Sequence, residues 1–408
     1  MTQDYDVLIV GGGLNGPALS LALARNGLSV AVIDALPLAE RQETRFDGRA
    51  YALAISSQRL LWAIGLWPDI ADKAQPIREI KISDGHAGAG AAPFVLGFDH
   101  AEIEEGPMGF MIEDRFLRRP LLDAMAQEPR IRHLSGETVV AQDVQAYRTT
   151  ITLGSGKTLC GRVLAGCDGR QSGTAQRAGI RRTGRDYGQT ALVCAVAHEN
   201  PHRAIAHQFF MPPGPLAILP LPGNRSSIVW TESHETAAHI HALDDAGYIA
   251  ALRPRFGDFL GPIELAGARF TYPLTLTLAN ALVKDRLALV GDAAHGIHPI
   301  AGQGLNLGLR DIAALAEVLV HANRRGEDIG TIGVLERYQR WRRWDTATLA
   351  LATDGFNRLF SNDNPVLRGA RDLGLGLVNA VPGLRRTFIR EAAGLNGDLP
   401  RLMTGQPL

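Results

Sequence analysis

The sequence predicts an α/β fold with a parallel-sheet domain, a mostly antiparallel second domain and C-terminal helices. Two buried-strand patterns, one near the start of the chain and one near residue 290, each run into a glycine-rich turn and a helix. Segments within 186–274 alternate apolar and polar residues with period two, which is typical of half-buried strands. Residues 331–395 show helical spacing of apolar residues.

The first element is a βαβ unit. Val7–Val10 is a short apolar run of the kind expected for a buried parallel strand. It runs into the GGGLNG sequence of residues 11–16, which matches the pattern G-x-G-x-x-G. A small-residue helix over 18–25 and a second strand over 28–33 follow, and Asp34 closes that strand.

Each part of this unit suits a dinucleotide. Gly11 permits the tight turn, Gly13 lets a pyrophosphate approach the backbone, and Gly16 permits close packing of helix on strand. The helix N-terminus offers N–H groups to the phosphates, and Asp34 is placed to hold ribose hydroxyls. The unit does not decide between FAD and NAD, but it occurs once, so we expect one firmly bound dinucleotide. Its candidate binding residues are Gly11, Gly13, Leu14, Asn15, Gly16 and Asp34.

The second glycine-rich turn follows another buried-strand pattern at 286–290. It reads GDAAHGIHPIAGQGLNLGLRD over residues 291–311, and apolar residues recur at helical spacing from Leu305 onward. A strand therefore ends beside an acid, Asp292, and a second helix N-terminus is aimed at a ligand. No acidic or cysteine cluster accompanies His295 and His298, so we expect no metal site and a structural role for His295.

Residues 291–306 resemble the ribityl-binding segment of the aromatic hydroxylase class of FAD monooxygenases. The HPIAGQG form at 298–304 resembles the ubiquinone-biosynthesis hydroxylases. The resemblance covers nearly the whole chain and implies a Rossmann-like, parahydroxybenzoate-hydroxylase-like FAD-binding domain with an antiparallel β-sheet substrate domain. It implies that Asp292 binds the ribityl chain and that the backbone at Leu305 and Asn306 meets the flavin ring. The turn adds Pro299, Gly302, Gln303 and Gly304 to the candidates.

Three further segments resemble motifs of this family. The sequence GCDGRQS at 166–172 resembles its Asp-Gly motif, which implies contacts from Asp168 and Gly169 to FAD or pyridine nucleotide. The family has Arg three residues after the Ser, where this chain has Ala175. Either Arg177 takes its place or the reductant docks differently.

The other two segments bring arginines to the cofactor. DGRAYAL at 47–53 resembles the segment after the second strand and implies that Arg49 approaches the cofactor. The segment at 112–121 resembles a helix start near the adenine side, where Asp114, Arg115 or Arg118 is the contact; we select Arg118.

The resemblance implies an NAD(P)H-dependent flavoprotein monooxygenase. In that family NAD(P)H reduces FAD, O2 adds to give a C4a-hydroperoxyflavin, and the distal oxygen attacks an electron-rich ring. The implied function is hydroxylation of a polyprenylated phenol in ubiquinone biosynthesis. The alternatives are a soluble aromatic substrate and a non-catalytic FAD-bound subunit of a biosynthetic complex. No residue stands out as a general base, so we name no catalytic residue.

The motifs and patterns divide the chain into three parts. The FAD-binding domain is expected at 1–75, 105–185 and 275–330, the β-sheet substrate domain at 76–104 and 186–274, and a helical region at 331–408. In the helical region, Tyr338, Arg342 and Asp345 match the family's spacing. Two apolar helical faces follow, which can pack on the FAD domain or contact a membrane surface. One face consists of Val366, Ala370, Leu373 and Leu377, and the other consists of Leu384, Phe388, Ala392 and Leu395.

The composition excludes other classes of protein. Lys+Arg 42 and Asp+Glu 42 give no net charge, which argues against binding nucleic acid through the charge of the whole chain. Three cysteines fit a reducing cytoplasm better than a disulfide framework. No apolar run reaches the ~18 residues of a membrane span. We therefore expect a cytoplasmic protein that at most contacts the inner face of a membrane.

Overall fold

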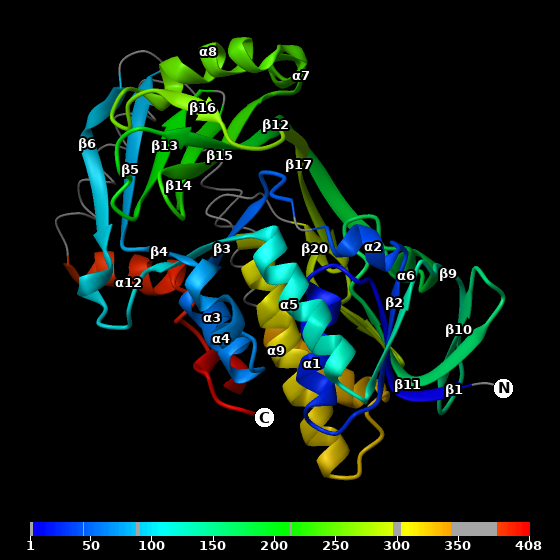
Figure 1. Cartoon of the computed structure of the whole chain (residues 1–408). Coiled ribbons are helices and arrows are strands. Elements are labelled where there is room, and N and C mark those ends of the chain that lie inside the picture. Colours follow the sequence, from blue (N-terminus) through cyan, green and yellow to red (C-terminus); the bar gives the residue numbers. More distant parts are fainter. Residues whose placement is uncertain (1–2, 44, 87–89, 213, 297–302, 344–381) are drawn as a thin grey trace.

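A computed structural model describes residues 3–43, 45–86, 90–212, 214–296, 303–343 and 382–408. Its strands form an eight-stranded, a nine-stranded and a three-stranded sheet (Figure 1). This is the mixed α/β architecture that the sequence predicts, with parallel strands in one sheet and mostly antiparallel strands in another.

Five parallel strands form the centre of the eight-stranded sheet. Val10 lies opposite both Ile33 and Gly166, and Gly166 lies opposite Leu289. The carboxyl ends of four strands therefore meet at one edge of the sheet. The parallel strands are β1 (Gln3–Val10), β2 (Val30–Asp34), β8 (Ile131–Ser135), β11 (Thr158–Gly166) and β19 (Leu287–Leu289), and the antiparallel additions are β9 (Val139–Val144), β10 (Thr149–Leu153) and β18 (Val283–Lys284).

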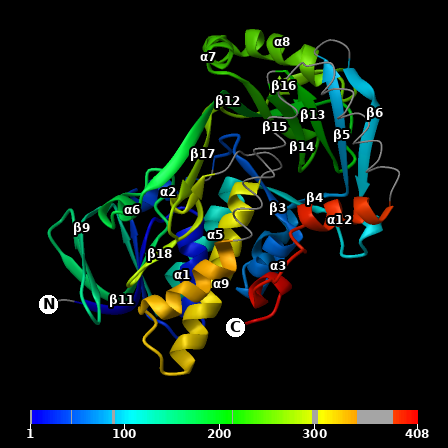
Figure 2. The ribbon, with the colours of Figure 1, turned by 180° about the vertical axis from the view of Figure 1, so that it is seen from behind.

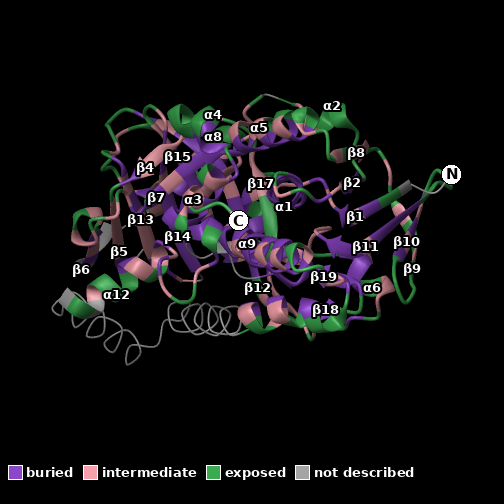
Figure 3. Cartoon of the chain, turned by 90° about the horizontal axis from the view of Figure 1, so that it is seen from below, coloured by how far each residue is buried: buried purple, intermediate pink, exposed green. Residues whose placement is uncertain are grey.

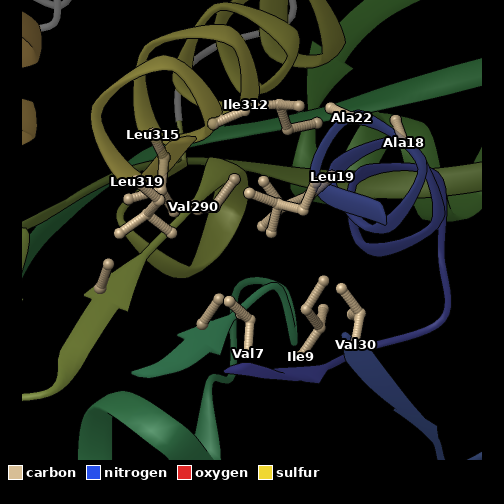
Figure 4. Close-up of a cluster of buried hydrophobic side chains, with 14 of the residues drawn as sticks. Val7, Ile9, Ala18, Leu19, Ala22, Val30, Val290, Ile312, Leu315 and Leu319 are labelled. Atoms are coloured by element: carbon tan, nitrogen blue, oxygen red, sulfur yellow. The ribbon is translucent and has the colours of Figure 1, made fainter. Parts of the chain in front are cut away.

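The main hydrophobic core lies between this sheet and two helices, α1 (Asn15–Ala24) and α9 (Gln303–Arg324). Residues 16–24 of α1 are all buried, because the helix packs against the strands, α5 and α9. Figure 4 shows Leu19 of α1 and Leu319 of α9 facing Val7 and Ile9 of β1. Burial of one such leucine contributes about 1.5–3 kcal/mol.

The nine-stranded sheet forms the second lobe. Its outer face is covered by two helices that bury Trp230, Tyr248 and Leu252 in a separate core. The strands are β5 (Glu79–His86), β6 (Gly90–Asp99), β12 (Arg182–His198), β13 (Ile205–Met211), β14 (Gly214–Leu221), β15 (Arg225–Ser233), β16 (Ile263–Leu265), β17 (Phe270–Ala279) and β20 (His295–Gly296), and the helices are α7 (His234–Ala242) and α8 (Asp245–Phe256).

Two long strands connect the lobes. β12 and β17 pair from Arg182 opposite Ala279 to Val193 opposite Phe270, and both run between the lobes in Figures 1 and 2. At the far end of β17, Thr277 pairs with Gly296 of β20, directly after the second glycine-rich turn begins. The nine-stranded sheet is therefore tied to the edge where the parallel strands end.

A small sheet lies between the lobes, and most of the remaining helices pack on it or on the parallel-sheet lobe, as α5 does on α1 and α6 on β9 (Figure 1). Strand β3 pairs with β7, and β7 pairs with β4. Strands β1 and β11 are largely buried and α2 largely exposed (Figure 3). These elements are β3 (Ala50–Ala54), β4 (Gln75–Ile77), β7 (Gly109–Glu113), α2 (Leu38–Arg41), α3 (Ile55–Ala63), α4 (Trp67–Ile70), η1 (Ala71–Lys73), η2 (His100–Glu102), α5 (Asp114–Gln127) and α6 (Gly173–Arg177).

The C-terminal segment packs on the body of the protein through α12 (Pro382–Ala392) and the 3-10 helix η5 (Arg401–Thr404). Ile389 and Ala393 are buried, and Arg385 lies 2.7 Å from the Glu102 carboxylate. Of the predicted face, Leu395 is buried as expected, but on α12 the prediction through Phe388 and Ala392 is wrong by one position, because the i, i+4 row of residues 385, 389 and 393 faces the protein. Phe388 stays 38% exposed. The other predicted face, at 366–377, lies outside the described residues.

Helical residues 332–343 continue the fold after α9. Tyr338 and Arg342 are both buried on this helix, while Asp345 lies outside the described residues. Among the helices of the described ranges, none has the length and apolar character of a membrane span. The same residues contain no group of three His, Cys, Asp or Glu side chains arranged for a metal ion.

The second lobe contains a histidine that makes stability depend on pH. His207 of β13 lies 4.6 Å, ring to ring, from Phe259. Burial, with a smaller effect from the Lys81 charge, lowers the pKa of His207 to about 4 from its ordinary 6.5. The unfolded chain therefore binds a proton between pH 6.5 and 4 that the folded chain does not, so stability falls as the pH falls through this window.

We expect this histidine alone to cost up to about 3 kcal/mol of stability between pH 7 and pH 4. Urea unfolding of wild type and His207→Phe at several pH values measures it, since phenylalanine keeps the aromatic contact and cannot titrate. The variant should lose less stability than wild type on acidification. Parallel pH profiles for the two proteins would contradict the assignment.

Candidate functional site

The candidate site lies where four parallel strands end. Gly11 follows β1, Asp34 ends β2, Asp168 follows β11, and Asp292 follows β19. In α/β sheets, ligands bind at the carboxyl edge of the strands, where helix N-termini also point. The strand pairing thus brings together, at one edge of the sheet, four residues that were predicted as cofactor contacts from different segments of the sequence.

The three glycines of the first turn serve different needs. Gly11 has a φ of 116°, and a Cβ there would lie 2.2 Å from the Cys167 carbonyl oxygen. A Cβ on Gly16 would lie 1.9 Å from the Gly11 carbonyl oxygen. A Cβ on Gly13 would meet no atom within 4 Å, so this position faces open space beside the N-terminus of α1. That space suits a pyrophosphate, and the turn therefore fits a dinucleotide.

Leu14 is the N-cap residue of α1, and the Asn15 side chain lies across the gap to the second glycine-rich turn. Its Nδ2 atom lies 2.1 Å from the position that a Cβ on Gly291 would take, and 2.6 Å from that of Gly308. The Asn15 Oδ1 atom is buried and has no hydrogen-bond partner among the described residues. An acceptor left unpaired between the two turns fits a bound group that donates a hydrogen bond there.

Asp34 is buried and engaged by a residue that the sequence did not single out. Arg41 of α2 donates from Nε to Oδ2 and from its second guanidinium nitrogen to Oδ1, both at 2.8 Å. The backbone N–H of Leu36 also bonds Oδ1. A carboxylate has about four lone-pair sites, so acceptor capacity remains for a ribose hydroxyl. No local pattern marks Arg41, because its role depends on the fold of the loop after β2.

Arg49 and Arg118 meet at one carboxylate, that of Asp114. Arg118 donates from Nε to Asp114 at 2.8 Å and to the carbonyl oxygen of Arg41 at 2.8 Å. Arg49 donates to Asp47 at 2.7 Å and has a guanidinium nitrogen 3.6 Å from Asp114. Burial raises the pKa of Asp47, but the hydrogen bond and charge of Arg49 outweigh it, so the net shift is downward. The two selected arginines therefore lie in one charged cluster.

Asp168 and Gly169 form a turn that starts α6. The Asp168 carboxylate accepts hydrogen bonds from the Ser172 hydroxyl and from the Thr174 N–H, and Gly169 has a φ of 78°. Ala175, which replaces the family's arginine, is fully buried in the core. Arg177 lies on the same short helix and donates to Gln142 at 3.2 Å. Asp168 therefore has a capping role, whatever ligand it also meets.

The second turn places Asp292 at the surface of the edge. Its carboxylate is 40% exposed and lies 3.2 Å from Nε of Arg170. Asn306, in the first turn of α9, accepts from the Ala54 N–H and the Ser57 hydroxyl and donates to the Ala52 carbonyl oxygen. The Asn306 side chain therefore fixes α9 to β3 and α3.

The remaining candidates of the second turn are only partly within the described residues. Leu305 packs against the main core, and a Cβ on Gly304 would meet nothing within 4 Å. Gln303 begins α9. Pro299 and Gly302 lie outside the described residues. The structure adds one cluster that the sequence did not predict: His295 and Arg342 both bond the Asp311 carboxylate, which also accepts the N–H of Gly291.

Comparison with known proteins identifies the family. A family model described as FAD binding domain matches residues 4–347. Ubiquinone hydroxylase UbiL of Rhodospirillum rubrum is 46% identical, over 99% of this chain and 93% of the relative. The 3-demethoxyubiquinol 3-hydroxylase of Escherichia coli is 34% identical, over 96% of this chain and 99% of the relative.

A solved structure shows the same fold. The p-nitrophenol 4-monooxygenase PnpA of Pseudomonas putida superposes with a TM-score of 0.80 at 20% identity, over 97% of this chain and 99% of that chain. At this identity the likeness establishes the fold alone, and it agrees with the parahydroxybenzoate-hydroxylase-like architecture. The family match and the relatives above show that the chain belongs to the FAD-dependent monooxygenases, in the family of the ubiquinone-biosynthesis hydroxylases.

Proposed function

We propose that this chain hydroxylates the aromatic ring of a polyprenylated phenol in ubiquinone biosynthesis. The observation that carries the proposal is the match over nearly the full length to relatives named as ubiquinone hydroxylases. FAD, when bound, supplies the electron storage and oxygen activation that no side chain provides, with NAD(P)H as reductant and O2 as co-substrate.

The proposed cofactor contacts follow the edge of the parallel sheet. Gly13 and the α1 N-terminus would receive the pyrophosphate, Asp34 the ribose, and Asp292 the ribityl chain. The backbone at Leu305 and Asn306 would meet the flavin ring, which the turn from Pro299 to Asn306 would border. Arg49, Arg118, Asp168 and Gly169 surround the same edge and complete the proposed set. We divide the chain between an FAD-binding and a substrate domain at the boundaries given above.

The chain's own residues hold and shield rather than react. The N–H groups at the two helix N-termini favour negative charge on the cofactor. The nine-stranded sheet, tied to the site by β17 and β20, would place the ring and keep water away from the reactive oxygen. We assign no general base for the phenol.

Quinone lipids extracted from cells that lack the gene test the function. We expect a prenylated phenol that lacks one or more ring hydroxyls, and rescue by the wild-type gene but not by Asp34→Ala. Purified holoprotein should oxidise NAD(P)H faster with that phenol and add one oxygen atom to it. Normal ubiquinone, with turnover on a soluble phenol instead, would contradict the proposal. Flavin binding without stimulated NAD(P)H oxidation would indicate a non-catalytic subunit.

We further propose a cytoplasmic protein that contacts the inner face of the membrane or a multi-subunit biosynthetic complex. A polyprenylated substrate partitions into the bilayer, so the enzyme must meet it there. Phe388 and Arg386, both exposed on α12, support this placement. Co-sedimentation with liposomes should fall in Phe388→Ser, and unchanged binding would count against a contact through α12.

A further inference from the structure

A carboxylate buried beneath the second glycine-rich turn holds that turn from below. Asp311 of α9 is fully buried. Its Oδ2 atom accepts the N–H of Gly291 at 2.9 Å and faces Nε2 of His295 at 2.6 Å. Its Oδ1 atom accepts Nε–H of Arg342 at 2.7 Å. One side chain therefore connects the turn, strand β20, α9 and helix 332–343.

The charges of this cluster keep the carboxylate ionised. Burial raises the pKa of Asp311, but the His295 and Arg342 partners outweigh it and hold the pKa below its usual range. A buried ion of this kind persists only where its partners are held in place. Tyr338, one turn before Arg342 on the same helix, donates to the Leu289 carbonyl oxygen at 2.8 Å. The helix thus braces both the end of β19 and the carboxylate.

The turn above is held from the other side as well. Gly291 has a φ of 62°, and the Asn15 side chain from α1 lies directly against it. Asp292, the next residue, carries the exposed carboxylate. Asp311 below and Asn15 above therefore leave the Gly291–Asp292 peptide little freedom to move.

We propose that Asp311, with His295 and Arg342, is a positioning residue that sets the Gly291–Asp292 turn in the orientation that binds flavin. Asp311 does not touch the cofactor in this proposal and acts through Asp292. The inference rests on the proposed contact of Asp292 with the ribityl chain.

A buried ion pair before β19 supplies a matched control. Arg286 is also fully buried and ion-paired, to Asp328, and it bonds the Ala146 carbonyl oxygen. It lies before β19, whereas Gly291 lies after it, so the two positions are at opposite ends of that strand. Loss of either buried pair should destabilise the fold, but only loss of the Asp311 pair should disturb the turn.

The test measures release of FAD from purified holoprotein by flavin fluorescence, together with the melting temperature. We expect Asp311→Asn to raise the Kd for FAD about tenfold or more, the scale on which partners behind a ligand-contacting group act. Arg286→Met should lower the melting temperature but change that Kd by less than about twofold. Equal losses of melting temperature with an unchanged Kd in Asp311→Asn would overturn the proposal.

A double-mutant cycle tests the route. If Asp311 acts through Asp292, then adding Asp311→Asn to Asp292→Ala should change the Kd by less than about twofold. If Asp311→Asn raises the Kd as much in the Asp292→Ala protein as it does in wild type, Asp311 does not act through Asp292.

A second pair of variants covers the case in which Asp311→Asn does not fold. His295→Gln keeps an N–H donor for the Asp311 carboxylate and should retain the affinity for FAD. His295→Phe removes that donor and should raise the Kd for FAD about tenfold. Equal affinity in these two would overturn the role. All these readouts use FAD alone, so a wild-type protein that binds FAD but does not hydroxylate the phenol refutes the substrate assignment and leaves this inference standing.

Discussion

A chain that ends at residue 381 is expected not to fold. The segment 382–408 buries the side chains of Ile389, Leu395, Leu402 and Met403. Each contributes about 1.5–3 kcal/mol, so their removal costs on the order of 6–12 kcal/mol. A whole domain has a free energy of unfolding of about 5–15 kcal/mol. Circular dichroism and thermal melting of the truncated protein should show no cooperative transition.

A point substitution on the same segment separates packing from other roles of the tail. Phe388→Ser alters a partly exposed side chain and should change the free energy of unfolding by less than about 1 kcal/mol. A truncated protein that melts at the wild-type temperature would contradict the packing of this segment. If the truncated protein does not fold, membrane binding must be tested with point substitutions, because deletion of residues 382–408 removes buried side chains as well as exposed ones.

The second large effect is expected from Gly13→Val. The φ of Gly13 lies outside the left-handed region, and a Cβ there meets nothing within 4 Å, so the chain without cofactor should accept valine. The added methyl groups would occupy the space through which a pyrophosphate approaches. We expect a folded protein whose Kd for FAD rises at least about a hundredfold, or roughly 3 kcal/mol. Flavin absorbance after purification and a fluorescence titration measure this.

Gly16→Ala is the matched control within the same motif. Its Cβ would lie 1.9 Å from the Gly11 carbonyl oxygen, so the strain falls on the protein itself. The free energy of unfolding of the cofactor-free chain should drop by about 1–3 kcal/mol. A Gly13→Val protein that keeps its flavin would show that the pyrophosphate lies elsewhere, and a fully stable Gly16→Ala would contradict the packing of α1 on the turn.

The parts of the fold that the sequence predicts are those with local patterns. An apolar run followed by G-x-G-x-x-G and a helix predicts one local fold, a βαβ unit, because each glycine is required within a few residues of the strand. Asp34 was predicted at the end of β2 and lies there. Strand β1 begins at Gln3 rather than Val7, since backbone pairing with β11 continues beyond the apolar residues.

Contacts between segments far apart in the chain could not be predicted from the sequence. Arg342 reaches Asp311 from 31 positions away, and no periodicity links them. The face of α12 is misplaced because the spacing of apolar residues does not show that Arg385 turns inward to Glu102. An ion pair with a partly buried partner, here Glu102, turns this charged residue toward the protein. Which residues contact the cofactor stays a prediction for the same reason, because the site depends on long-range placement.

The carboxyl edge of the parallel sheet has a consequence for how the protein survives in a cell. Its four turns come from positions near 11, 34, 168 and 292, so the edge exists only after distant segments have come together. A cofactor that binds this edge binds the folded chain alone, and by mass action it adds about 2.7 kcal/mol of stability at a hundredfold excess over its Kd. The supply of flavin would then govern not only how active the enzyme is but how much of it escapes degradation.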